Sequence, residues 1–306
     1  MFVAYKNGNY RVLLNLEDGT KIRYNNENVL YPSRPESIDV KITNRCPHGC
    51  LFCHENSVPD GRIAKYATLI DFAEALLPYT EIAVGGGNVL ENPKHTLFFL
   101  EELKKVKAIP SITVRQDDFI NNLELLKEWK QRQLIYGIGV SLCDSSDSNL
   151  ISCLKTCPTS VLHVIAGIFN KKDYENLKGH DIKMLVLGYK NIRRGKSYGE
   201  THLKKLTKNI LMLQSHYEDF VKDFNTVAFD NLALEQLEVE KFMSPADWKK
   251  YYLGDDGRYT FYVDLVEEEF ARSSTNLNRI NIQGYTPQEM FNIIQGIEIL
   301  KEIRNY

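Results

Sequence analysis

Two alternating periodicities organise the middle of this 306-residue chain. Short runs in which apolar and polar residues alternate predict β-strands, and stretches with apolar residues three and four positions apart predict helices that lay one stripe against a sheet. Tyr66, Leu69, Ala73 and Leu76 form such a stripe, which ends at Pro78. Because strands and helices alternate, we expect a parallel sheet with right-handed crossovers, as a closed or a partial barrel. The predicted strands span 37–43, 81–86, 109–115, 135–141, 161–167 and 182–188.

The two ends of the chain follow other patterns, which divide it into three parts. Residues 1–35 read as an N-terminal β-meander that we expect to form a stabilising lid on the bottom or edge of the barrel. The core barrel spans 36–224, and residues 225–306 read as a C-terminal α+β cap packed on the core. In the meander, hairpin turns are predicted at Asn7-Gly8 and Asp18-Gly19. A helix from Thr201 to about Phe224 closes the core. In the cap, strands are predicted at 226–229 and 259–265 and helix caps at Ser244 and Thr286, and the helix after Thr286 runs close to the end of the chain.

A cysteine-rich loop of the form C-x3-C-x2-C directly follows the first core strand. Cubane iron–sulfur clusters are normally held by four cysteines, so a trio leaves one iron able to bind another molecule. Zinc, with His48 or His54 as a fourth ligand, is the alternative, although structural zinc sites usually split into two short ligand pairs separated by a longer loop. A disulfide suits so tight and odd a trio less well. The three candidate metal ligands are Cys46, Cys50 and Cys53.

The motif, its place after a first strand and the aromatic Phe52 before the last cysteine resemble the radical S-adenosylmethionine (radical SAM) enzymes. The resemblance implies a (β/α)6 partial TIM-like barrel with ligands at the carboxyl ends of its strands. It also implies a [4Fe-4S] cluster on the three cysteines and S-adenosyl-L-methionine on the free iron. In that family a reductant such as flavodoxin or ferredoxin drives cleavage to a 5′-deoxyadenosyl radical, which abstracts hydrogen from a substrate. The resemblance covers about residues 37 to 190 and not the flanks.

A glycine-rich turn, Gly85, Gly86, Gly87 and Asn88, ends the second core strand. Consecutive glycines let a backbone approach a ligand closely and leave its polar groups free. The turn resembles the one whose backbone meets the methionine amino group in the family. Asn88 stands where the family usually has an acidic residue, and an ordinary glycine turn before a helix is the alternative.

Further cofactor contacts are implied by the resemblance at the ends of the other strands, since polar side chains there point into the open mouth of a barrel. Arg115 and Ser141 are assigned to the methionine carboxylate and the ribose hydroxyls. Ala166 and Gly167 would give the adenine a small-residue platform. Two more candidates lie in the cysteine loop beside the nucleoside, namely Phe52 and His54.

A basic loop, Lys190–Ser197, follows the sixth strand at the same mouth. Its charges would hold a phosphate, a carboxylate or an acidic substrate, although a solvated loop is the alternative. It is not a nucleotide P-loop, because Gly188 and Gly195 are too far apart for that motif. The candidate substrate residues are Arg193, Arg194 and Lys196, with Asp230, Tyr262, Asp264 and Arg272 of the tail as further pocket candidates.

The remaining cysteines do not suggest a second cluster. Cys153 and Cys157 share a helical stripe with Leu150 and Leu154, which predicts burial in the core. Cys143 stays a candidate hydrogen donor, as in peptide epimerases of the family.

Composition and charge indicate where the protein acts and which partners it lacks, but they say little about its reaction. A net charge of −2 argues against a broad electrostatic grip on nucleic acid. The amino terminus is too poor in apolar residues for a signal peptide, and no run approaches the ~18 apolar residues that span a membrane. Six cysteines with an oxygen-sensitive motif fit a reducing cytoplasm.

The leading hypothesis is therefore a radical SAM enzyme acting on an unidentified peptide, nucleotide or small molecule. An activase-like enzyme that makes a glycyl radical on a partner protein is the runner-up, favoured by the Cys53–His54 pair. A non-catalytic iron–sulfur or zinc protein is the alternative of another class, and it would need a fourth protein ligand.

Overall fold

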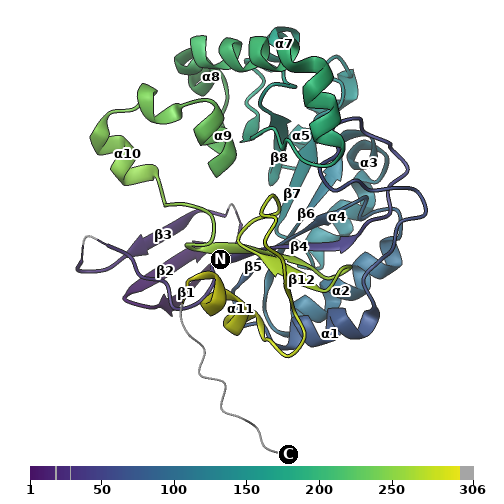
Figure 1. Cartoon of the computed structure of the whole chain (residues 1–306), viewed down its shortest axis with the longest axis vertical. Helices are drawn as coiled ribbons and strands as arrows, with labels where there is room; N and C mark the ends of the chain where they lie inside the picture. The colour runs from purple at the N-terminus through teal and green to yellow at the C-terminus, as the bar shows by residue number, and fades with distance from the viewer. Residues whose placement is uncertain (18, 28, 297–306) are drawn as a thin grey trace, which may run out of the picture.

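A large parallel sheet forms the centre of the molecule, as predicted (Figure 1). The computed structural model describes residues 1–17, 19–27 and 29–296. Six parallel strands follow one another in chain order and match the predicted positions closely. They are β4 (Ser37–Thr43), β5 (Glu81–Gly86), β6 (Ile109–Arg115), β7 (Gly137–Ser141), β8 (Ser160–Ile165) and β9 (Lys183–Leu187).

The C-terminal segment extends this sheet at both edges. β10 (Thr226–Phe229) pairs in parallel with β9, and β11 (Thr260–Asp264) pairs in parallel with β4. β12 (Glu269–Ala271) and β13 (Ile280–Asn281) continue beyond β11 in antiparallel orientation. The strand order is thus β10-β9-β8-β7-β6-β5-β4-β11-β12-β13, so the predicted cap shares the sheet of the core at two places.

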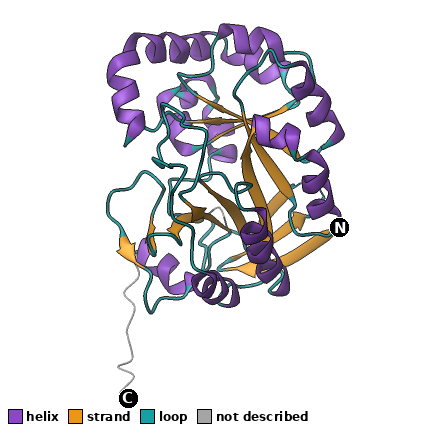
Figure 2. Ribbon diagram, turned by 90° about the vertical axis from the view of Figure 1, so that its right-hand side faces the viewer, coloured by secondary structure: helices purple, strands orange, loops and turns teal. Residues whose placement is uncertain are grey.

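Helices pack along the outer face of the sheet (Figure 2), and alternate strand residues on the other face retain exposed surface. Apolar residues such as Ile38, Val40 and Val84 are almost fully buried on the helix side. The alternate residues of the same strands, among them Asp39 and His163, retain exposed surface, and we call this side the open face. The helices before β10 are α1 (Tyr66–Glu74), α2 (Pro93–Lys105), α3 (Gln116–Asn121), α4 (Leu123–Gln131), α5 (Ser148–Thr156), α6 (Lys171–Leu177), α7 (Arg194–Ser215) and α8 (Tyr217–Asp223).

The structure corrects the start of one predicted helix and confirms two predicted helix caps. The helix predicted from Thr201 begins earlier, at Arg194, so half of the predicted basic loop is helical. The predicted caps at Ser244 and Thr286 are confirmed, because each hydroxyl accepts a backbone N–H of the helix that follows. The predicted run of the last helix into residues 297–306 lies outside the described residues. The remaining helices are α9 (Asn231–Gln236), the 3-10 helix η1 (Val239–Phe242), α10 (Pro245–Tyr251) and α11 (Pro287–Ile294).

The N-terminal meander is a separate antiparallel sheet of β1 (Phe2–Asn7), β2 (Tyr10–Asn15) and β3 (Lys21–Tyr24). Its turn at Asn7-Gly8 is present, with Gly8 at φ +58°, whereas Asp18 of the second predicted turn lies outside the described residues. Side chains of β2 and β3 converge on a buried carboxylate just before β4. A cavity of about 260 Å³ separates the end of β2 from the amino ends of the parallel strands.

That buried carboxylate belongs to Glu36, which is 1% exposed. Lys21 Nζ lies 3.1 Å from Glu36 Oε2, and Arg23 donates to the same carboxylate. The Tyr10 hydroxyl donates to Glu36 Oε1 at 2.6 Å, and Lys21 also pairs with Glu81 of β5. We call Lys21, Arg23 and Glu36 the amino-end ion cluster. Within the part of the chain that the structure describes, no helix is long and apolar enough to cross a membrane.

Candidate functional site

The cysteine loop, residues 44–58, rises from the carboxyl end of β4. A bridge between Arg45 and Val58 closes its base, where the Cys46 amide donates to the Val58 carbonyl at 2.9 Å. The three candidate thiols are free and partly buried. Burial raises the pKa of the Cys46 thiol, and repulsion from the thiols of Cys50 and Cys53 adds to it, so the three groups lie within electrostatic reach of one another.

The candidate donor set consists of three cysteine thiols, and thiolates are the usual ligands of iron–sulfur clusters as well as of structural zinc. Among residues 1–17, 19–27 and 29–296, no three His, Cys, Asp or Glu side chains lie close enough to hold one metal ion. Arg115 Nη1 donates to Cys50 Sγ at 3.4 Å, so this guanidinium lies directly beside a candidate metal ligand.

The glycine turn lies directly beside this loop. The amides of Gly87 and Asn88 donate to the carbonyls of Thr43 and Arg45, both at 2.7 Å. The turn was expected to leave its polar groups free, but these two N–H groups are already used within the protein. A Cβ at Gly86 or Gly87 would overlap the same two carbonyls. Only Gly85, of the three glycines, faces open space, and a ligand therefore has access to the turn at that position.

Asn88 and His48 fix the turn and the loop to each other. The Asn88 side chain accepts the Leu90 amide at 2.9 Å, and its amide group lies 3.4 Å from His48 Nε2. His48 also pairs with Asp118 at 2.7 Å. The structure gives His48 and Asn88 contacts that hold the backbone in place.

The strand-end candidates separate into two groups. Arg115 lies beside Cys50, and Ser141 is partly accessible, with a hydroxyl that makes no hydrogen bond to the described residues. Ala166, by contrast, is fully buried in the hydrophobic core, and a Cβ at Gly167 would press on Leu206. The structure therefore leaves the Ala166 side chain no access to an adenine, because it points to the helix side of the sheet.

Phe52 and His54 face the start of α7. The Phe52 ring packs edge-on against Tyr198 at 5.7 Å between centroids. His54 Nε2 lies 3.2 Å from Glu55 Oε1 and 3.2 Å from Lys190 Nζ. Burial and the nearby Lys190 charge lower the pKa of His54, while its contact with Glu55 opposes this.

The basic residues of the predicted substrate loop contact the cysteine loop. Arg193 donates to the His54 carbonyl at 3.0 Å and lies 3.1 Å from Glu55 Oε2, while Arg194 donates to the Ser57 carbonyl. Lys196 is exposed on the first turn of α7. The two guanidinium groups thus have partners within the protein, at the cofactor side of the site.

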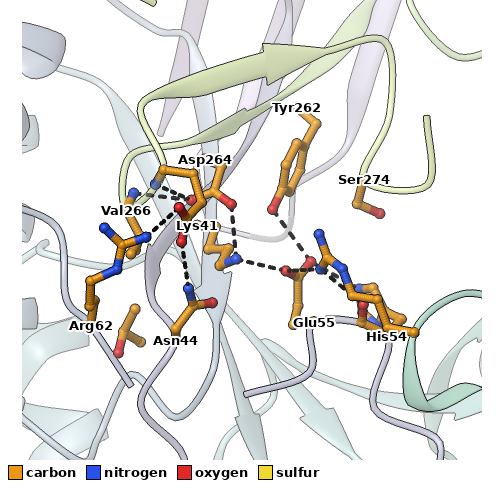
Figure 3. Close-up of polar contacts among 12 residues, drawn as sticks. Lys41, Asn44, His54, Glu55, Arg62, Tyr262, Asp264, Val266 and Ser274 are labelled. Carbon is orange, nitrogen blue, oxygen red and sulfur yellow. Dashed lines mark hydrogen bonds and ion pairs between the residues drawn. The ribbon is translucent and has the colours of Figure 1, made fainter. Parts of the chain in front are cut away.

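A second buried ion cluster contacts Glu55 of the cysteine loop from the side away from His54 (Figure 3). Lys41 of β4 is 3% exposed, and its Nζ lies 2.8 Å from Asp264 Oδ2 and 3.0 Å from Glu55 Oε2. Burial disfavours the Glu55 carboxylate, but hydrogen bonds from His54 and Lys41 hold its pKa well below the usual range. We call Lys41, Glu55 and Asp264 the carboxyl-end ion cluster.

Sequence reasoning missed Lys41 and Glu55. The alternation of β4 predicts a polar, half-exposed lysine, whereas the structure pairs this position with β11 and places the cysteine loop against it. Of the predicted pocket residues, Asp264 is in the cluster, and the Tyr262 hydroxyl donates to Glu55 Oε1 at 3.4 Å. The other two lie elsewhere: Asp230 caps α9, and Arg272 donates to the Ile294 carbonyl.

The predicted placement of Cys153 and Cys157 in the core is confirmed, and the role of Cys143 stays a prediction. Cys157 is 2% exposed in the core, and Cys153 packs against the same core. Cys143 is exposed near Arg115 and Cys50, and surrounding atoms raise the pKa of its thiol to about 11, although the Arg115 charge opposes this.

Comparisons with known proteins bear on the fold. Neither a protein-family model nor a curated protein matches this sequence. The structure of Streptococcus suis SuiB bound to S-adenosylmethionine has a TM-score of 0.56 and 12% identity, covering 92% of this chain and 84% of that one. The structure of SuiB bound to the precursor peptide SuiA has a TM-score of 0.56 and 12% identity, covering 100% of this chain and 91% of that one.

A third solved structure agrees with these two. It is anSMEcpe with bound AdoMet and the Cp18Cys peptide, with a TM-score of 0.55 and 16% identity, covering 87% of this chain and 84% of that one. At such identities the likeness shows a shared fold, and the fold is one that these S-adenosylmethionine-binding proteins have in common with this chain.

Proposed function

We propose that this protein is a radical SAM enzyme whose β4–β9 region forms a (β/α)6 partial barrel. One observation carries the proposal: a loop with three partly buried, neighbouring cysteines rises from the carboxyl end of β4, beside an open position at Gly85, in a fold shared with proteins solved with S-adenosylmethionine bound. Ligands bind at the carboxyl ends of strands in such folds.

The cysteine loop would hold a [4Fe-4S] cluster through Cys46, Cys50 and Cys53. When bound, that cluster and S-adenosyl-L-methionine supply reductive cleavage to a 5′-deoxyadenosyl radical, which abstracts hydrogen from the substrate. The fold supplies position and isolation from water. Arg115 keeps a positive charge 3.4 Å from the Cys50 sulfur, and Ser141 presents a free hydroxyl at the end of β7.

A peptide is the substrate class that we favour. The titles of two neighbours name a bound peptide, SuiA for SuiB and Cp18Cys for anSMEcpe. Accessible residues along the open face, including Asp39, Ser111 and His163, offer polar contacts to an extended chain. The reductant would be a flavodoxin or ferredoxin, and the oxidoreductase would work in the cytoplasm, where such reductants and an oxygen-sensitive cluster persist.

Anaerobic reconstitution with iron and sulfide tests the proposal. We expect an iron–sulfur spectrum that changes when S-adenosylmethionine is added, because one iron has no protein ligand. With dithionite, the protein should slowly release 5′-deoxyadenosine even without substrate, measured by chromatography. Zinc as the purified metal, or a cluster indifferent to S-adenosylmethionine, would refute it.

A further inference from the structure

The pairing of β11 with β4 brings the C-terminal segment to the cysteine loop. Asp264 is the register partner of Lys41, although 223 residues separate them. Asp264 Oδ2 accepts from Lys41 Nζ at 2.8 Å, and its Oδ1 accepts the amides of Val266 and Glu267, both at 3.0 Å. Both oxygens are therefore used, and this carboxylate has one fixed orientation.

Lys41 connects the fixed Asp264 carboxylate to the cysteine loop. Its ammonium also lies 3.0 Å from Glu55 Oε2, and Glu55 stands two residues after Cys53. The Lys41, Glu55 and Asp264 side chains are 3%, 6% and 5% exposed, so all three charged groups of the cluster are buried. Removing one partner of a buried pair leaves an uncompensated charge, which strongly favours rearrangement of its neighbours.

Lys41 also supports the glycine turn. It is the register partner of Gly85, and a Cβ at Gly86 would come within 2.8 Å of Lys41 Cγ. The same side chain therefore contacts the loop that carries the cysteines and lies under the turn with the open position.

We propose that Lys41 and Asp264 are positioning residues for the iron–sulfur cluster, acting through Glu55 to set the place of Cys53. The C-terminal segment is then part of the cofactor site. This inference rests on the proposed function, since it concerns the same loop. Partners in the shell around metal ligands orient those ligands and tune the metal.

Asp264→Asn is the sharpest variant, because it keeps the shape and the oxygen that accepts the two amides while removing the charge that faces Lys41. Glu36→Gln is the matched control: it removes a buried carboxylate with cationic partners at the other end of the sheet. Both full-length proteins are reconstituted anaerobically. The measurements are iron per chain, the rate of cluster loss to EDTA, and the electron paramagnetic resonance spectrum of the reduced cluster with and without S-adenosylmethionine.

We expect Asp264→Asn to lose its cluster about tenfold faster than the wild type and to show an altered spectrum with S-adenosylmethionine. Glu36→Gln should lower thermal stability and leave both readouts unchanged. Lys41→Arg, which retains the charge, should give a rate nearer the wild type than Lys41→Met.

Wild-type rates and spectra in Asp264→Asn would overturn the inference while the proposed function stands. Equal changes in Asp264→Asn and Glu36→Gln would also overturn it, because they would reduce the effect to general stability. A wild type that takes up no cluster would overturn the proposed function and this inference together.

Discussion

Two buried ion clusters lie at opposite ends of the same strand region and have different geometries. At the amino end, one carboxylate, Glu36, accepts from two cations of the meander. At the carboxyl end, one ammonium, Lys41, lies between two carboxylates, one from the cysteine loop and one from β11. The first joins two sheets, whereas the second joins the sheet to the loop that carries the candidate metal ligands.

The sequence distances show the same contrast. Glu36 and Arg23 are 13 residues apart, whereas Lys41 and Asp264 are 223 apart. The amino-end cluster joins segments from the first part of the chain, whereas the carboxyl-end cluster forms only when β11 pairs with β4. We infer that the amino end of the sheet carries stability and the carboxyl end carries chemistry, as is general for parallel α/β folds.

The largest expected effect comes from Cys50→Ala, which removes chemistry from the carboxyl end alone. Iron uptake and 5′-deoxyadenosine release should fall to background, because two thiolates do not hold a cubane. The unfolding free energy of the metal-free protein should change by less than about 1 kcal/mol, since Cys50 is only partly buried. Iron analysis and urea titration measure the two. A full iron complement in this variant would exclude Cys50 as a ligand.

Glu36→Gln should produce the opposite pattern. The variant leaves Arg23 without its buried carboxylate, so we expect a loss of about 3 kcal/mol in unfolding free energy. Cluster content should match the wild type. Urea unfolding with tryptophan fluorescence measures stability, and a loss of iron without a loss of stability would reverse the roles assigned to the two ends.

Between the two ends, His163 offers a pH test. Its ring lies over Gly139, and burial lowers the pKa of His163 from 6.5 to about 4. The unfolded chain therefore binds the proton more readily between these values, and the His163 contribution to stability, complete above pH ~6.5, is lost as the pH falls toward ~4. That loss amounts to about 3 kcal/mol.

His163→Asn isolates this contribution. The wild type minus variant difference in unfolding free energy should fall by about 3 kcal/mol from pH ~7 to pH ~4. The comparison is needed because Asp39 acts in the opposite direction: partial desolvation by the surrounding protein raises its pKa to about 6, so the folded state takes up its proton first. A difference that does not change with pH would show that the pKa of His163 is the same in the folded and the unfolded protein.

The smallest stability effect is expected for Arg193→Ala. Arg193 is 40% exposed, and pairs of this kind contribute at most about 1 kcal/mol. Because it contacts His54 and Glu55, substrate-free 5′-deoxyadenosine release should nevertheless decrease, whereas Lys205→Ala, on the exposed surface of α7, should not change it. A normal rate of substrate-free release in Arg193→Ala would return this arginine to the predicted substrate role.

Local patterns were sufficient to predict much of the fold. The alternation in β4–β9, the hairpin at Asn7-Gly8 and the capping box at Thr286 are all short-range signals, and each is confirmed. The cysteine loop and the glycine turn were also predicted as neighbours, since they follow adjacent strands.

Long-range pairing explains what was not predicted. No local periodicity indicates that β11 will insert beside β4, and without that pairing Lys41 reads as an ordinary polar position. Arg194 was predicted to lie in the basic loop before a helix at Thr201, yet α7 begins at Arg194. Ala166 was placed beside the adenine on the family resemblance, whereas the structure buries its side chain on the helix side of the sheet. A shift of one residue along a strand reverses the face on which a side chain lies.

Gly86 and Gly87 are required by a crossing of two backbone segments, whatever binds nearby. Glycine at these two positions would therefore be retained in a descendant that had lost its cofactor. Gly85 has no such internal constraint, because a Cβ there meets no other atom. In a related sequence, a larger residue at this position alone would therefore indicate loss of cofactor binding with the fold retained.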